Sequence, residues 1–179
     1  IAIKNKTSKG NLVTKYPIFR VYHKEVGEST LGGRKIWLDN TIGKLNLDNQ
    51  GVFLGSFNSD DLIISINEEG YYELGSTDFS KRYNMKQLVL IEKFNPDKYY
   101  SVIYKNGLSR EYYLKRFKIE TSTIDREFSL TQDVSHSKIF AATSKEGHIL
   151  KFNYITKKGE KKTKEVKIDD FVRVKNWKS

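Results

Sequence analysis

Basic residues interleaved with aromatic ones are the chemical feature that recurs most often along this chain. Exposed Lys and Arg side chains can contact the phosphates of a nucleic acid, which positions a duplex without reading its sequence. We predict DNA contacts for residues in turns or on the polar faces of strands: Lys9, Lys15, Arg34, Lys35, Lys81, Arg82, Arg110, Lys115, Arg116 and Lys118. For any one of these residues an ordinary solvated side chain is the simpler interpretation. Their repetition and the net charge favour binding for the set.

Other groupings that could support chemistry are weaker. The three histidines, His23, His136 and His148, lack the spacing that places two metal ligands on one helix or strand face. The paired carboxylates Asp60-Asp61 and Asp169-Asp170 each adjoin an apolar run. Capping of turns and strand edges therefore explains them better than general acid and base catalysis. No Gly-x-Ser-x-Gly motif supplies a nucleophile for acyl transfer.

The glycines from Gly27 to Gly33 have a spacing that imitates a phosphate-binding P-loop. In a P-loop, Lys and Ser or Thr follow the second glycine and a helix begins there. Here Gly33 and Arg34 take those positions, and the next residues, 35–38, favour a strand. The motif therefore gives little support for nucleotide binding.

Composition narrows the classes of protein further. The chain has 179 residues, enough for one domain spanning 1–179, and its formal net charge of +10 favours a polyanionic partner. The absence of cysteine excludes a disulfide scaffold, a Cys-ligated metal site and a thiol nucleophile. No apolar run is long enough to span a membrane. We therefore expect a cytoplasmic protein. We also expect a fragment of a longer protein, because the chain starts at Ile1 within a strand-like pattern.

The pattern of apolar residues predicts an all-β fold. Aromatic residues make up 13% of the chain, and only two prolines occur. Alternation predicts that Phe117 and Ile119 face inward while Arg116 and Lys118 face solvent. By the same alternation, Leu150, Phe152 and Tyr154 should share the inner face of a half-buried strand. The nearly continuous apolar runs 62–66 and 101–104 should be covered on both faces.

Four segments repeat one pattern, an apolar run, a short polar turn with glycine, and a polar-aromatic run. The glycines are Gly43, Gly70, Gly107 and Gly147, each suited to the positive φ of a tight hairpin. The intervals after Gly70 are near the roughly 40 residues of a four-stranded propeller blade, although the first interval is shorter. We predict about four such blades, with a two-sheet sandwich as the alternative. The Lys-rich stretch 157–162 is interpreted as a solvated hairpin tip.

Three stretches of the chain carry a resemblance to a known family. Residues 8–15 (SKGNLVTK), 29–37 (STLGGRKIW) and 113–121 (YLKRFKIET) resemble the C-terminal region of the A subunits of bacterial type IIA topoisomerases. The likeness is greatest to the topoisomerase IV A subunit of the Bacteroidetes type, which is also described as a gyrase A subunit. The resemblance implies a β-pinwheel, which is a propeller-like ring or open spiral, that binds duplex DNA along a basic outer rim.

The resemblance also implies where catalysis occurs. In the complete enzyme, a tyrosine in an N-terminal region cleaves DNA with Mg2+, while ATP is hydrolysed by a separate B subunit. We therefore expect no cofactor in this chain. We expect its partners to be double-stranded DNA, the ATPase B subunit, and the other parts of the A subunit. The short motif 32–35 is at most a reduced form of the gyrase box that supports tight wrapping. About four blades would form an open or incomplete ring.

These observations lead to one expected function and three alternatives. We expect a non-catalytic domain that binds and bends duplex DNA in the nucleoid and presents a segment for strand passage. A propeller scaffold for protein interactions, with a basic surface that only aids solubility, is the main alternative. A single-strand binder that stacks bases on exposed Tyr side chains is another. A freestanding enzyme is the weakest alternative.

Overall fold

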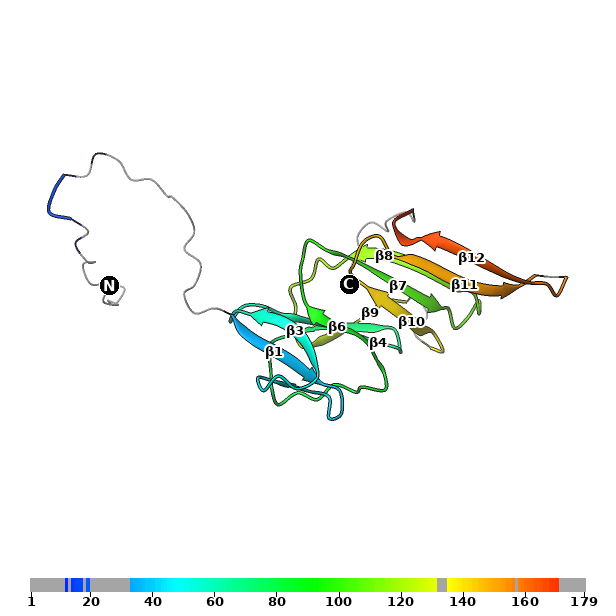
Figure 1. Cartoon of the computed structure of the whole chain (residues 1–179), viewed down its shortest axis with the longest axis horizontal. Coiled ribbons are helices and arrows are strands. Elements are labelled where there is room, and N and C mark those ends of the chain that lie inside the picture. The colour runs from blue at the N-terminus through cyan, green and yellow to red at the C-terminus, as the bar shows by residue number, and fades with distance from the viewer. Residues whose placement is uncertain are drawn as a thin grey trace. The chain divides into compact units, whose positions relative to one another are not determined.

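The computed structural model describes residues 33–131, 135–156 and 158–170, together with residues 12, 14–17 and 19. The chain divides into two compact units, Ile1–Leu31 and Gly32–Ser179. All the strands described below belong to the second unit (Figure 1). The prediction of a single domain over 1–179 stays a prediction.

The strands form small antiparallel sheets that follow one another along the chain. The first sheet has the order β2-β1-β3 and consists of β1 (Arg34–Asp39), β2 (Lys44–Asn46) and β3 (Val52–Phe57). The second has the order β6-β4-β5-β9 and consists of β4 (Ile63–Asn67), β5 (Tyr71–Gly75), β6 (Leu88–Lys93) and β9 (Arg126–Ser129).

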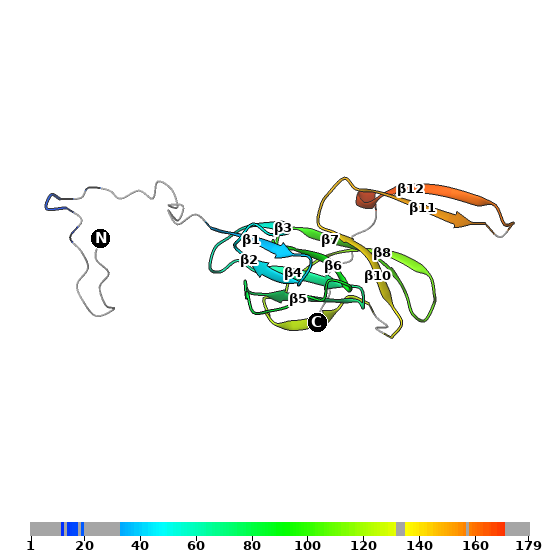
Figure 2. The same cartoon turned by 60° about the horizontal axis from the view of Figure 1, so that its bottom comes forward.

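The third sheet and a terminal hairpin complete the described fold. The third sheet has the order β10-β7-β8 and consists of β7 (Tyr99–Lys105), β8 (Tyr112–Lys118) and β10 (Lys138–Thr143). The hairpin, called here the β11–β12 ribbon, consists of β11 (Ile149–Ile155) and β12 (Lys161–Lys167). A 3-10 turn, η1 (Ile168–Asp170), follows it. Figure 2 shows the same succession from a second side.

Two segments of the chain return to pair with an earlier sheet. β6 pairs with β4, the first strand of the preceding hairpin, and β10 pairs in the same way with β7. By contrast, β9 lies beyond the β7–β8 hairpin in sequence but returns to pair with β5 of the second sheet. Arg82 repeats this return on a smaller scale, because it forms a bridge to Lys44 of β2 after the β4–β5 hairpin. Each return connects one sheet to the next.

Apolar side chains fill the space between successive sheets. Ile36, Leu38 and Phe57 of the first sheet form one core with Ile63 of β4. The adjacent residue Ile64 belongs to a second core, between the second and third sheets. The further buried members of that second core include Ile66, Tyr72, Leu74, Tyr100, Val102, Phe117 and Ile119. Neighbouring residues of a strand point to opposite faces, so β4 is covered on both sides.

The sequence predictions about the fold are confirmed in part. The fold is all-β, and Ile63, Ile64 and Ile66 in the run 62–66 are fully buried as expected. Four small sheets occur, which agrees with about four repeats, but only the second has four strands within the described ranges. Three sheets pack in series, so the two-sheet sandwich is wrong. The described residues do not form a closed ring.

The prediction for β11 is wrong in part. Leu150 is half-buried, but Phe152 and Tyr154 on the same face are 39% and 41% exposed. The ribbon is a two-stranded sheet, so among the described residues only its base packs against another sheet. Alternation in the sequence identifies which side chains share a face, but it does not show how much of that face packs against another sheet.

Three of the four repeat glycines adopt the predicted positive φ, at Gly43, Gly70 and Gly147. Gly107 does not; in that turn Arg110 is the residue with positive φ. Gly107 is required for another reason, because a Cβ there would lie 2.1 Å from the carbonyl oxygen of Ser135. Its glycine permits close approach of two backbone segments.

Gly43 and Gly147 form a matched pair for testing how close backbone approach affects stability. A Cβ at Gly43 would lie 2.1 Å from the carbonyl oxygen of Tyr83, whereas a Cβ at Gly147 meets nothing within 4 Å. Gly147→Ala should therefore cost only the left-handed backbone penalty, about 1–2 kcal/mol. Gly43→Ala should cost at least about 3 kcal/mol because a backbone clash is added. Urea denaturation of both variants measures the difference, and equal losses would contradict the close approach of Tyr83.

Candidate nucleic-acid interface

Two of the predicted DNA-contact residues belong to the first unit. Lys9 lies outside the described residues. Lys15 is described and exposed. The remaining predicted residues, Arg34, Lys35, Lys81, Arg82, Arg110, Lys115, Arg116 and Lys118, belong to the second unit.

The residues at the first sheet remain exposed, with one exception. Arg34 and Lys35 begin β1, and Arg82 lies beside β2. Lys81 is instead half-buried, and its Nζ forms an ion pair with Glu73 Oε1 at 2.5 Å. Its ammonium group also lies 5.6 Å from the centre of the Tyr83 ring. Because Glu73 neutralises it, Lys81 is poorly suited to bind a phosphate.

Lys115 and Arg116 are both buried. The prediction that Arg116 faces solvent is therefore wrong, and neither side chain is placed to contact DNA at the surface. Residues 115–117 are buried in succession, so alternation between core and solvent fails here. Lys115 points to the same face as Phe117, and its Nζ donates a hydrogen bond to the carbonyl oxygen of Leu130 at 2.9 Å. Burial lowers the pKa of Lys115 to about 8. Alternation fails in β8 because both faces of this strand are covered, so neither face reaches solvent at residues 115–117.

Arg116 holds the base of the β11–β12 ribbon against the third sheet. Its Nη1 donates to Asp169 Oδ1 at 2.6 Å, and its Nη2 lies 3.4 Å from Glu146 Oε1. The other carboxylate oxygen of Asp169 accepts a hydrogen bond from the backbone N–H of Gly147 at 2.7 Å. Glu146 precedes the ribbon and Asp169 follows it, so this group, called here the Arg116 clamp, joins both ends of the ribbon to β8.

The carboxylate pairs behave partly as expected. Asp169 and Asp61 both accept backbone N–H hydrogen bonds, Asp61 from Asn58 at 2.6 Å. Burial opposes ionisation of Asp61, but hydrogen bonds from Lys93 and Asn58 lower its pKa overall. These contacts confirm a capping role for one member of each pair.

Lys118 and Arg110 occupy intermediate and exposed positions. Lys118 is partly exposed, and its Nζ lies 3.7 Å from Asp97 Oδ1, which is itself almost fully exposed. Exposed ion pairs of this kind contribute little. Arg110 is exposed in the β7–β8 turn and forms no ion pair with any described residue. Both remain available to an anionic partner.

The most concentrated basic surface is one that the sequence prediction missed. It is the β11–β12 ribbon, whose described lysines are all exposed: Lys151, Lys158, Lys161, Lys162, Lys164 and Lys167. Two of them form exposed ion pairs, Lys151 with Glu165 and Lys162 with Glu160, both at 3.2 Å. The density of lysine in 151–167 is the signal that could have identified this surface, although a solvated hairpin tip is the simpler interpretation of its centre.

Charge is distributed unevenly along the second unit. Residues 33–97 contain seven Lys or Arg and ten Asp or Glu, whereas residues 98–170 contain sixteen and ten. The first two sheets are therefore close to neutral or slightly acidic. The basic excess lies on the third sheet and the ribbon.

Two other features are absent from the described part of the chain. No three His, Cys, Asp or Glu side chains within it are placed to hold a metal ion. None of its helices is long and apolar enough to cross a membrane.

Comparison with protein families decides where this chain belongs. The family model described as "Topoisomerase C-terminal domain, Bacteroidota" matches residues 44–179, about three quarters of the sequence. The chain belongs to this topoisomerase C-terminal domain family. The match spans β2 to β12 and confirms the resemblance to a topoisomerase, but it does not distinguish the subunit. No curated protein and no solved structure matched the chain.

The different positions of Arg116 and Lys118 in this topoisomerase domain lead to a direct test. Arg116→Glu would place a third carboxylate against Asp169 and Glu146 and should cost about 3–5 kcal/mol, as expected when a buried ion pair is broken. Lys118→Glu changes a partly exposed residue and should stay within about 0.5 kcal/mol. Urea midpoints of the two variants measure this. If both variants were as stable as the parent, the Arg116 clamp would be wrong.

Proposed function

We propose that this topoisomerase C-terminal domain is a non-catalytic module that binds and bends duplex DNA. It belongs to the A subunit of a type IIA enzyme, either topoisomerase IV or gyrase, where it presents a DNA segment for strand passage. The observation that carries the proposal is the basic excess of residues 98–170, exposed above all on the ribbon, in a topoisomerase domain family. Phosphate contacts made by such residues give affinity for duplex DNA that does not depend on its sequence.

Bending follows from contacts that lie on more than one element. Arg110 and Lys118 belong to the third sheet region, whereas Lys161 and Lys164 belong to the ribbon. A duplex must bend to contact cations on both elements. The elastic energy of bending is offset by the additional phosphate contacts that the bend permits. The surface therefore supports capture and curvature of DNA without base readout.

In this proposal the chemical steps occur elsewhere in the enzyme. DNA cleavage by a tyrosine with Mg2+ would then belong to another part of the A subunit, and ATP hydrolysis to the B subunit. The partners of this domain are then duplex DNA, the B subunit, and the other parts of its own subunit. Its place in the cell is the nucleoid, in the cytoplasm.

One observation favours a second candidate, a scaffold for protein interactions. Tyr112 and Phe140 are 64% and 52% exposed on the third sheet, with ring centres 5.5 Å apart. Lys105 Nζ lies 5.6 Å from the centre of the Tyr112 ring. An exposed aromatic pair can bind an apolar side chain of a partner. The same pair could also stack against an unpaired base.

The salt dependence of DNA binding separates these candidates. If at least three or four cations contact phosphates, log K should fall against log salt with a slope of about −3 or steeper. Fluorescence anisotropy with a labelled duplex between low and physiological salt measures the slope. Two unrelated duplex sequences should give similar affinities.

Two outcomes would contradict the proposed function. A flat salt dependence would show that phosphates are not the ligand, which favours the scaffold. Tighter binding to single strands than to duplex of the same sequence would favour base stacking on aromatic side chains.

A further inference from the structure

Two cations on the first two sheets are already neutralised by ion pairs, and carboxylates outnumber cations in residues 33–97. Lys81 pairs with Glu73, and Lys93 pairs with Asp61 at 2.6 Å. Lys138 of the third sheet pairs with Glu68 at 2.7 Å. Each of these carboxylates must be displaced before its lysine can bind a phosphate at full strength. These regions therefore offer fewer free charges than their lysine content suggests.

The β11–β12 ribbon differs because it carries six exposed lysines and only two carboxylates among its described residues. Lys158, Lys161, Lys164 and Lys167 form no ion pair with a residue that the structure describes. All four side chains are exposed. The two lysines that do pair, Lys151 and Lys162, have partners that are themselves more than half exposed, so the pairing is weak.

The register of the ribbon distributes cations over both of its faces. Phe152 lies opposite Lys164 and Tyr154 opposite Lys162, so these four side chains share one face. Ile155 lies opposite Lys161 and Ile149 opposite Lys167, on the other face. Within the described ranges neither edge of the ribbon pairs with a further strand. A duplex can thus approach a narrow element that is basic on each side.

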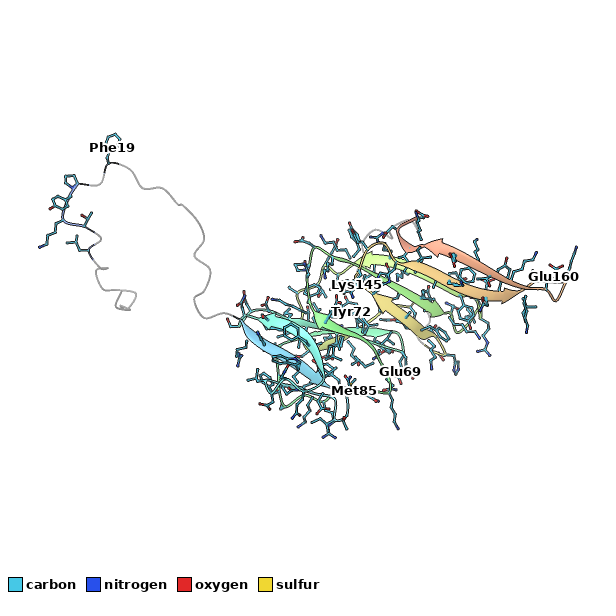
Figure 3. The ribbon with its side chains drawn as sticks, in the orientation of Figure 1. Phe19, Glu69, Tyr72, Met85, Lys145 and Glu160 are labelled. Atoms are coloured by element: carbon cyan, nitrogen blue, oxygen red, sulfur yellow. The ribbon has the colours of Figure 1, made fainter. Side chains whose placement is uncertain are left out.

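The ribbon is anchored at its base and extends away from the sheets at its tip. Figures 1 and 2 both show the tip beyond the third sheet, and Glu160 marks it in Figure 3. The Arg116 clamp and a hydrogen bond from Ile168 N to His148 O at 3.0 Å fix the base. Leu150 and Ile168 border a groove of about 280 Å3 against Ile103 and Leu114 of the third sheet. The lysines are therefore presented from a fixed base.

We propose that the β11–β12 ribbon is the principal duplex-DNA contact of this domain, and that the first-sheet cations contribute little. This inference rests on the proposed function and names the surface that carries it. A two-stranded antiparallel ribbon is narrow enough for the major groove, about 12 Å wide, where phosphates of both strands flank it. Lysines on both faces match that arrangement of charge.

Two matched triple variants test the proposal in the whole chain. The ribbon variant carries Lys161→Glu, Lys164→Glu and Lys167→Glu. The control carries Lys35→Glu, Arg82→Glu and Lys86→Glu, which reverses the same number of exposed cations at the first two sheets. Duplex binding is measured by anisotropy as a function of salt. Circular dichroism and urea midpoints check that both variants fold, and a version of each triple with Gln in place of Glu serves if a Glu version does not.

The ribbon variant should lose at least about tenfold in affinity, and its salt slope should become shallower by about 2–3, near 0.9 for each lost contact. The control should lose less than about threefold. Equal losses would mean that bulk charge accounts for the attraction, and a larger loss in the control would locate binding at the first sheet. Either result overturns the ribbon proposal while the proposed function stands. Failure of the unaltered chain to bind duplex DNA would instead overturn both.

Discussion

The structure depends on the fact that no small sheet in this chain can bury its apolar faces alone. β4 has Ile63 on one face and Ile64 on the other, and each belongs to a different core. Fully burying such a side chain contributes about 1.5–3 kcal/mol, so exposure of either face would be costly. Each sheet therefore requires a neighbour, and the returning strand β9 keeps the second and third sheets together.

The same constraint decides which basic residues reach solvent. β8 is covered on one face by the second sheet and on the other by the base of the ribbon, so Lys115 and Arg116 become interior groups. Arg116 remains charged because Asp169 and Glu146 pair with it. Arg116, which is buried, thus fixes the base of the β11–β12 ribbon, and the ribbon carries the exposed lysines. Arg116 supports the basic surface from beneath it.

The features that can be predicted from the sequence are those that depend on neighbouring residues. The run 62–66 indicates a strand covered on both faces, and the positive φ of Gly43, Gly70 and Gly147 follows from local hairpin patterns. Features that depend on distant residues are missed. Alternation places Arg116 in solvent because it assumes one wet face, whereas the cover of Arg116 comes from Asp169, 53 residues away. The hairpin pattern correctly predicts that Lys161 is exposed, but the burial of Lys115 and Arg116 on β8, which leaves the ribbon with the densest exposed lysines, is visible only in the structure.

Protection of individual lysines by DNA is the most direct measure of where the duplex lies. Lysine acetylation of the chain, with and without saturating duplex, followed by mass spectrometry, reports each Nζ separately. Binding through the ribbon predicts strong protection of Lys161, Lys164 and Lys167 and unchanged reactivity of Lys35, Lys44 and Lys86. Protection centred on Lys35 and Lys44, with the ribbon lysines still reactive, would contradict binding through the ribbon.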